Sequence, residues 1–402
     1  MADSRAYFDH AATTPLDPRV LEAMLPYLTT SWGNPSSIYA EGREAAKGLD
    51  LARRKVAEIL NCKPAEVIFT SGGSEADNSA VRGAAYGNRR RGNHIITTAI
   101  EHHAILHAAE RLEQEDFRVT YLPVDSEGFI SLDDLDAALT DETTLVSIMY
   151  ANNEIGTIEP VPEAASLVKA RNPHTVVHSD TVQAAGYLDL DVERLRVDML
   201  TLAAHKFYGP RGIGVLYVRQ RTPFQAQVVG GSQERSRRAG TENVAGAVGL
   251  ARALELAYAE RDERVSQIRA MRDYLLREIP ERVPGVRITG PMDLERRLPG
   301  NLSLCFERLE GEPVLLQLDL NGFSASSGSA CTTGSMEPSH VLSACGIDVD
   351  TARGSLRLSL GKDNTMEQCR RLVEILPGIV EKLRRLQPTY RDTQPASAST
   401  GA

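Results

Sequence analysis

The chain has 402 residues, too many for one compact core, so two domains are expected. Its 42% hydrophobic and 25% charged residues are typical of a globular protein, and it contains no run of about eighteen apolar residues that would span a membrane. The net charge of −9 opposes direct contact with nucleic acid, while five scattered cysteines and the absence of an apolar secretory signal in MADSRAYFDH favour a cytoplasmic protein with reduced thiols.

The first predicted elements are two helices and a strand. Asp17 suits the N-cap of a helix, and Pro18 suits its first turn. Residues 38–60 are rich in Ala, Glu, Arg and Leu with few breakers, which predicts a long helix. Residues 65–70, AEVIFT, have the apolar character of a strand.

The stretch SGGSEADN at 71–78 follows that strand at once and leads into a helix that begins at Ser74. Gly72 and Gly73 let a ligand approach the backbone closely, and the free amides of the first helical turn point toward it. The passage is therefore a candidate anion cradle. A plain turn between a strand and a helix is the alternative.

Histidines gather near the start of the next helix. A strand is predicted at 94–98 and a helix at 101–114, with His102 at the transition between them. His102 is placed to lie flat over a bound cofactor ring, and capping of the helix is its alternative role. His103 and His107 are four residues apart, a spacing that can hold a metal, but no matching carboxylate motif accompanies them.

Further strands are predicted at 117–122 and 144–150, separated by a short helix at 131–139. The second of these strands ends in ANNEIGT, which places Asn153 at a carboxyl end. The alternation of strands and helices from 65 to 218 predicts an α/β fold, in which a mostly parallel sheet of about seven strands is flanked by helices.

Two further apolar runs end in polar residues. The strand predicted at 176–178 is followed by Asp180, just past its carboxyl end, and then by Gln183. The run at 197–202 leads to Lys206, on a loop before another β-rich stretch.

A lysine, a carboxylate and an amide donor are what pyridoxal phosphate needs. The lysine binds the aldehyde covalently, the carboxylate keeps the pyridine nitrogen protonated, and the amide can meet the ring hydroxyl. A single lysine after a strand is more often an ordinary solvated side chain. The cofactor interpretation gains weight because ligand-type residues recur at the same edge of the predicted sheet: Ser74, His102, Asn153, Asp180, His205 and Lys206.

The rest of the chain predicts a smaller domain. Residues 243–279 have the pattern of one long connecting helix, and short strands mix with helices after it, as in an α+β domain. We therefore expect a large domain at 15–262 and a small domain built from 1–14 and 263–386. The composition of 387–402 predicts a disordered tail.

Cys331 lies in a stretch of different character. The Ser- and Gly-rich loop at 324–338 is expected to be poorly held, as a swinging arm requires. A thiol near its reference pKa of about 8.5 is a few per cent thiolate at neutral pH and is already a strong nucleophile. The other cysteines fall in helical or strand patterns and are expected to have no role: Cys62, Cys305, Cys345 and Cys369.

Taken together, these residues make the chain resemble the cysteine desulfurases of the iron–sulfur cluster sulfur-donor type, which are class V aminotransferase-like enzymes of fold-type I. The similarity runs from DHAATTP at 9–15 to LRLSLG at 356–361. It rests on seven motifs in the expected order: SGGSEADN, EHHA at 101–104, NNEIGT at 152–157, SDTVQAAG at 179–186, HKFYGPRGIG at 205–214, RAGTEN at 238–243 and GSACTTGSMEPSHVL at 328–342.

The resemblance implies a cofactor role for several residues. Lys206 would carry pyridoxal phosphate, with Asp180 at the pyridine nitrogen. Gln183 would meet the ring hydroxyl, and His102 would stack on the ring. The phosphate would be bound by Gly73, Ser74, His205 and, from a second subunit, Thr241, which implies a homodimer.

The resemblance also implies the reaction. Asn153 and Arg357 would hold the carboxylate of L-cysteine, a task that suits a bidentate guanidinium. Cys331 would attack the substrate's sulfur and keep it as a persulfide while L-alanine leaves. The sulfur would then pass to acceptor proteins, such as an iron–sulfur scaffold or tRNA-thiolation proteins.

Other functions stay open at this point. A sulfur donor for DNA phosphorothioation would look alike, and a selenocysteine lyase or another enzyme of the same fold would keep Lys206 and Asp180 without needing Cys331. A catalytically silent docking scaffold would need none of the three. Three positions depart from the family pattern: Tyr39, Ser74 and Ala203. Ala203 lacks the hydroxyl that many members have there, which is expected to weaken phosphate binding by about 1 kcal/mol.

Overall fold

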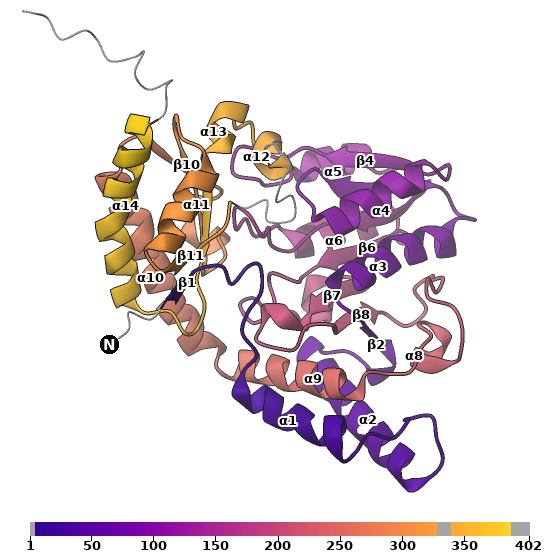
Figure 1. The fold of residues 1–402 in the computed structure, drawn as a ribbon. Helices are drawn as coiled ribbons and strands as arrows, with labels where there is room; N and C mark the ends of the chain where they lie inside the picture. Colours follow the sequence, from indigo (N-terminus) through magenta and orange to yellow (C-terminus); the bar gives the residue numbers. More distant parts are fainter. Residues whose placement is uncertain (1–4, 328–338, 387–402) are drawn as a thin grey trace, which may run out of the picture.

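The computed structural model describes residues 5–327 and 339–386. Cys331, most of the loop predicted at 324–338 and the tail predicted at 387–402 lie outside the described residues. Figure 1 shows a large part built on one wide sheet and a smaller part that ends with α14 (Met366–Leu386). None of the helices in the described ranges combines the length and the apolar character that crossing a bilayer requires.

A seven-stranded sheet forms the centre of the large part (Figure 1). The strand order is β2-β8-β7-β6-β5-β3-β4, in which β8 runs antiparallel to both neighbours and the other pairs are parallel. The prediction of an α/β fold with a mostly parallel sheet is confirmed. The strands are β2 (Val67–Thr70), β3 (His94–Thr98), β4 (Arg118–Leu122), β5 (Thr143–Ser147), β6 (Val176–Asp180), β7 (Met199–Ala203) and β8 (Gly214–Val218).

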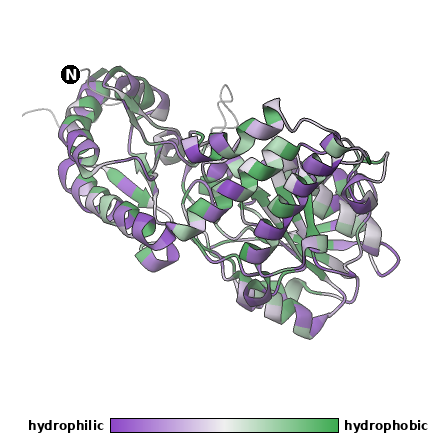
Figure 2. Ribbon diagram, turned by 90° about the horizontal axis from the view of Figure 1, so that it is seen from below, coloured by the Kyte–Doolittle hydropathy of each residue, from purple (hydrophilic) through white to green (hydrophobic). Residues whose placement is uncertain are grey.

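Helices cover both faces of this sheet because successive strand residues point to opposite sides. Leu145 and Val176 pack with α3 and α4, whereas Val146 and Val177 pack on the other face with α2, α6 and α9. Figure 2 shows the strands largely green, as expected for strands that are buried on both faces. The helices are α1 (Pro18–Thr29), α2 (Ala40–Leu60), α3 (Gly73–Asn88), α4 (His103–Glu113), α5 (Leu132–Ala138), α6 (Val161–Arg171), α7 (Val192–Leu195), α8 (Gln233–Ser236) and α9 (Val244–Ala259), with 3-10 turns η1 (Pro64–Glu66) and η2 (Ala204–Lys206).

One predicted helix is wrong. Residues 243–279 do not form a single connector but two helices, α9 and α10 (Arg261–Arg282), which meet at Glu260. Glu260 has φ −103° and ψ 7°, and its carboxylate binds Arg264 Nη2 at 2.7 Å and Arg19 Nη1 at 2.5 Å. The break falls within a stretch whose residues are all compatible with a helix, so periodicity within 243–279 does not reveal it.

The smaller part has its own core. Ala6 and Phe8, at the start of the chain, are buried together with Leu304 and Leu372. The N-terminal segment therefore packs with C-terminal elements, while the domain boundaries at 14/15 and 262/263 stay predictions. The elements are β1 (Ala6–Tyr7), β9 (Val286–Thr289), η3 (Leu294–Arg296), β10 (Asn301–Phe306), α11 (Gly311–Leu320), β11 (Phe323–Ser324), α12 (His340–Ala344), α13 (Val349–Arg353) and β12 (Ser355–Ser359), with β1 beside β11 and β10 between β12 and β9.

A further apolar cluster joins the two parts beside the carboxyl ends of the central strands. Ile100 and Met149 follow β3 and β5, and they pack with Val341 and Leu342 of α12. The first helix after the undescribed stretch 328–338 is therefore fixed at the sheet edge where the site residues were predicted.

Candidate active site

Lys206 and Asp180 come from neighbouring strands of the central sheet. Asp180 is the last residue of β6, rather than just past it, and is the register partner of Thr201 in β7. The chain leaves β7 at Ala203 and makes one 3-10 turn, η2, that ends at Lys206. Because β6 and β7 are parallel, both side chains start from the same edge of the sheet.

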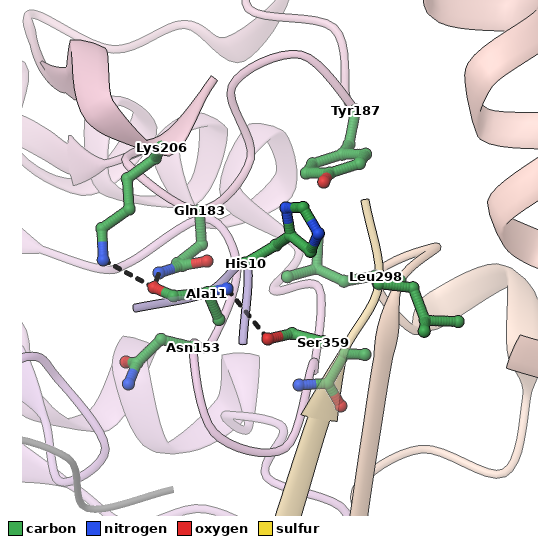
Figure 3. A pocket seen from close by; sticks show the side chains of 11 residues that line it. His10, Ala11, Asn153, Gln183, Tyr187, Lys206, Leu298 and Ser359 are labelled. Atoms are coloured by element: carbon green, nitrogen blue, oxygen red, sulfur yellow. Dashed lines mark hydrogen bonds between the residues drawn. The ribbon is translucent and has the colours of Figure 1, made fainter. Parts of the chain in front are cut away.

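The N-terminal segment closes over Lys206. Its Nζ donates to the backbone oxygens of Ala11 at 2.6 Å and Ala12 at 3.0 Å, and Gln183 Nε2 also donates to Ala11 O at 3.0 Å. Figure 3 shows Lys206, Gln183 and Asn153 around the pocket, with Ala11 among them. Ala11 and Ala12 belong to the stretch DHAATTP, at which the family resemblance begins. Its sequence does not indicate a role for these backbone carbonyls, since every residue carries one.

Asp180 is buried, 6% exposed, and its Oδ1 accepts a hydrogen bond from Val182 N at 2.9 Å. Burial raises its pKa to about 6, against the hydrogen bond from Val182 and the positive charge of Lys206, which lower it. Asp180 therefore prefers a positively charged neighbour, which a protonated pyridine nitrogen supplies.

A second carboxyl group, Asp77 of α3, lies beneath Asp180. It interacts with Thr201, the strand partner of Asp180, and burial followed by the charge of Asp180 raises its pKa well above the ordinary value. Two carboxylates in one dry pocket do not both ionise. Since Asp180 faces Lys206, Asp180 carries the charge and Asp77 stays neutral. Sequence reasoning missed Asp77, because a buried helix residue has no local signature of its role.

The side chain of His178 is buried near this pair, and both of its ring nitrogens have hydrogen-bond partners. Its Nδ1 lies 2.9 Å from Ser147 Oγ and its Nε2 lies 3.0 Å from Thr201 Oγ1. The nearest oxygen of Asp77 is 3.9 Å from Nε2, too far for a hydrogen bond. Burial lowers the pKa of His178 to about 3, so its ring is neutral.

This buried histidine predicts a loss of stability in acid. In the unfolded chain the pKa of a histidine is about 6.5, so between that value and about 3 only the unfolded state binds the proton, and stability falls as the pH falls. We expect His178→Gln, whose amide can bond both hydroxyls, to reduce the pH slope of the free energy of unfolding by about 1 kcal/mol per pH unit between about pH 6 and 4. Chemical denaturation at several pH values measures this slope. The exposed His174→Gln is the control, and an equal change of slope in both variants would contradict the prediction.

His102 is the N-cap of α4, and its Nδ1 accepts a hydrogen bond from Ala104 N at 3.1 Å. The helix-capping alternative is therefore correct, and stacking on a cofactor ring stays a prediction. Burial, followed by the charge of Lys206, lowers the pKa of His102 to about 4. The neutral ring thus carries its proton on Nε2. The rings of His103 and His107 stack at 5.0 Å, and no metal-binding cluster occurs among the described residues.

The predicted anion cradle follows β2 directly. Helix α3 begins at Gly73, and Ser74 is exposed in its first turn. A Cβ at Gly73 would lie 3.2 Å from Val182 Cγ2 and 3.4 Å from the Cβ of Ala203, so a side chain here would require Val182 to shift by a few tenths of an ångström. His205 lies beside Lys206, with Nδ1 3.1 Å from Thr13 Oγ1, and burial lowers its pKa to about 4.

Arg357 and Asn153 are in contact, while their role in holding a substrate carboxylate stays a prediction. Arg357, on β12, is 2% exposed, and its Nη1 donates to Asn153 O at 3.0 Å. Its Nη2 donates to Asp9 Oδ1 at 2.8 Å. Asn153 lines the same pocket as Lys206 and Gln183, so a guanidinium stands next to the candidate cofactor site.

Two predicted residues are not part of this constellation in the described chain. Thr241 is exposed on the segment before α9. Cys331 lies outside the described residues, but the chain on both sides of it reaches the site. Ser326 N donates to Arg357 O at 3.2 Å, and after the undescribed stretch Ser339 Oγ donates to Glu154 Oε2 at 2.5 Å.

The chain is similar to known proteins over nearly its whole length. The family model for class V aminotransferases matches residues 6–372. A protein from Clostridium botulinum (strain Hall) named cysteine desulfurase IscS is 50% identical over 390 residues, which cover 97% of this chain and 98% of the relative. A solved structure of a NifS-like protein has a TM-score of 0.89 and 39% identity, covering 94% of this chain and 100% of that chain. A structure of SspA in complex with cysteine has a TM-score of 0.78 and 33% identity, covering 90% of this chain and 100% of that chain.

Proposed function

The chain belongs to the class V aminotransferase family and, within it, to the cysteine desulfurases, and from this we propose that it converts L-cysteine to L-alanine and keeps the sulfur as a persulfide on Cys331. The observation that carries the proposal is the meeting of four groups at one sheet edge. Asp180 ends β6, Lys206 ends the turn that follows the neighbouring strand β7, and Asn153 and Arg357 stand beside them.

The donor set suits pyridoxal phosphate, on which this family depends. When bound, the cofactor supplies an electron sink for a carbanion at the substrate's α-carbon. Lys206 would bind it covalently and give up its hydrogen bonds to Ala11 and Ala12. The ionised Asp180 would face the pyridine nitrogen, and Gln183 would meet the ring hydroxyl.

The phosphate would lie at the start of α3, where Gly73 and Ser74 offer amides and a hydroxyl and the helix dipole favours an anion. His205 would contact it from the side of Lys206. The missing hydroxyl at Ala203 leaves one contact fewer there. His102, whose Nδ1 is taken by Ala104 N, would present its ring face or its Nε2 proton to the cofactor.

Arg357 and Asn153 would orient the substrate by its carboxylate. The thiolate of Cys331 would then attack the substrate's sulfur. A sulfur–sulfur bond forms, the carbon–sulfur bond breaks, and the electron pair left on carbon takes up a proton to give L-alanine. The amine of Lys206 would be placed to hold and return such a proton.

The thiols of the described chain support Cys331 as the nucleophile. Burial raises the pKa of each of the other four cysteines to about 12, which keeps them protonated at neutral pH. They are Cys62, Cys305, Cys345 and Cys369. None of these four cysteines lines the pocket that holds Lys206.

We propose a homodimer as the working form. Helix α1 exposes a row of leucines at helical spacing: Leu21, Leu25 and Leu28, which are 42%, 46% and 57% exposed. Trp32, at 70%, and Ile38, at 90%, continue the apolar surface after the helix. A water-exposed face of this kind marks a protein interface. Thr241 would then reach the phosphate in the second subunit's site.

The persulfide would pass to acceptor proteins, and we propose an iron–sulfur scaffold as the first of them, with tRNA-thiolation proteins as a second class. Purified protein supplied with pyridoxal phosphate, L-cysteine and a thiol reductant should yield equal amounts of L-alanine and sulfide. Mass spectrometry without reductant should find one extra sulfur on the peptide that contains Cys331. Alanine without this persulfide, or turnover of selenocysteine but not of cysteine, would contradict the proposal.

A further inference from the structure

The segment between β8 and α9 has an unusual backbone. Glu234, Arg235 and Ser236 are three consecutive residues in the left-handed region, with φ of 46°, 58° and 62°. Residues other than glycine avoid this region, and a run of three needs outside support. Thr241 lies five residues beyond, exposed to solvent.

The support comes from an ion pair that reaches into the core. Arg53 Nη1 and Nη2 each donate to a carboxylate oxygen of Glu234 at 2.7 Å, and Phe69 N donates to the same carboxylate at 3.2 Å. Arg53 also donates to Val67 O at 2.6 Å and lies 4.8 Å over the ring of Phe69. The two side chains are 7% and 2% exposed. We call this pair the Arg53–Glu234 clamp.

A second ion pair holds the segment four residues later. Arg238 Nε donates to Glu75 Oε1 at 2.9 Å, and Glu75 also accepts a hydrogen bond from Ser71 N at 2.8 Å at the start of α3. A hydrogen bond from Gly240 N to Gln233 Oε1, at 3.1 Å, joins the residues that flank these two anchors. The backbone that carries Thr241 is therefore fixed to the large sheet of its own chain.

A buried ion pair adds little net stability, because desolvation of both charges offsets their attraction, but it can select one backbone conformation. Here the selected conformation is strained, and it leaves a hydroxyl residue exposed. We propose that Arg53 and Glu234 are positioning residues that act in trans: the clamp presents Thr241 to the cofactor phosphate of the partner subunit. This inference rests on the proposed dimer.

Mixed dimers test where the clamp acts. The clamp is removed by Arg53→Met with Glu234→Gln, which leaves no unpaired buried charge. Two differently tagged chains are co-expressed, and only dimers with both tags are purified. In the first mixed dimer, one chain carries Lys206→Ala and the other carries the clamp variant. In the second, one chain carries all three substitutions and the other carries none. Each dimer then has one lysine-bearing site.

The measured quantity is the dissociation constant of pyridoxal phosphate at the lysine-bearing site, from titration followed by borohydride fixation. In the first dimer that site receives its Thr241 segment from a chain with an intact clamp, so binding should be normal. In the second dimer it receives a released segment, and binding should be about tenfold weaker, the loss of one hydrogen bond. The reverse pattern, or equal binding in both dimers, overturns the inference.

Two measurements separate this result from others. The control double substitution is Lys169→Met with Asp198→Asn, which neutralises an ion pair of 2.5 Å between α6 and the residue before β7, at the amino ends of the strands. When it replaces the clamp substitutions, pyridoxal phosphate should bind equally well in both mixed dimers. Light scattering of the unsubstituted protein reports its oligomeric state. A monomer would overturn the proposed dimer and the trans inference together, whereas a cis pattern in a dimer overturns only the latter.

Discussion

Lys206→Ala should yield a folded protein that turns over L-cysteine at least about 10⁴-fold more slowly than the unsubstituted chain. Lys206 is the residue on which covalent binding of the cofactor would depend, and it is also placed to return a proton to the substrate. The fold should survive, because Lys206 is half-buried at a pocket and its loss leaves the carbonyls of Ala11 and Ala12 accessible to water. The rate of alanine formation measures the effect.

Two further variants separate charge from covalent binding. Lys206→Arg keeps a cation beside Asp180 but cannot bind the aldehyde, so it should be as inactive as the alanine variant while Asp180 stays ionised. Lys362→Ala removes the lysine that bonds Asp17 Oδ2 at 3.2 Å and lies 5.0 Å over the Tyr208 ring, and it should retain borohydride-fixable cofactor. Cofactor fixed covalently in Lys206→Ala would show that another lysine carries it.

Many residues of this site could be predicted from the sequence, because they lie at or just after the carboxyl ends of strands. The strand at 94–98 has the predicted bounds, and apolar runs ending in Asp180, Lys206 and Asn153 placed these residues at one edge. A parallel sheet brings such ends together whatever the order of its strands. Local pattern and tertiary position therefore agree for these residues.

The parts that were missed depend on contacts between distant segments. The antiparallel direction of β8 is set by pairing with β2 and β7, which an apolar run does not encode. Glu260, where α9 and α10 meet, pairs with Arg19 in α1, which is far away in the sequence. In the sequence Asp77 looks like an ordinary helix residue, and only the packing of α3 on the sheet brings it close to Asp180. The Arg53–Glu234 clamp joins residues that are 181 positions apart, so the sequence around one residue does not predict its contact with the other.

Cys331→Ala should abolish persulfide formation and sulfur transfer while leaving cofactor binding unchanged. The reason is the state of the remaining thiols. At neutral pH a thiol with a pKa of about 12 is thiolate about 10³-fold less often than one near the reference value of about 8.5, so no other cysteine of the described chain replaces the nucleophile. Sulfide release in the presence of a reductant should fall by about the same factor.

Cys62→Ala is the matched control, since Cys62 is the half-buried one among the four and its removal disturbs the core least. It should keep full persulfide formation, detected as one added sulfur on the peptide that contains Cys331. The decisive comparison is alanine formation in the Cys331 variant. If alanine still forms at the unsubstituted rate, the carbon–sulfur bond breaks without a protein nucleophile, as expected for an enzyme of the lyase type on the same fold. If alanine and sulfide fall together, the thiol at 331 is the group that takes the sulfur.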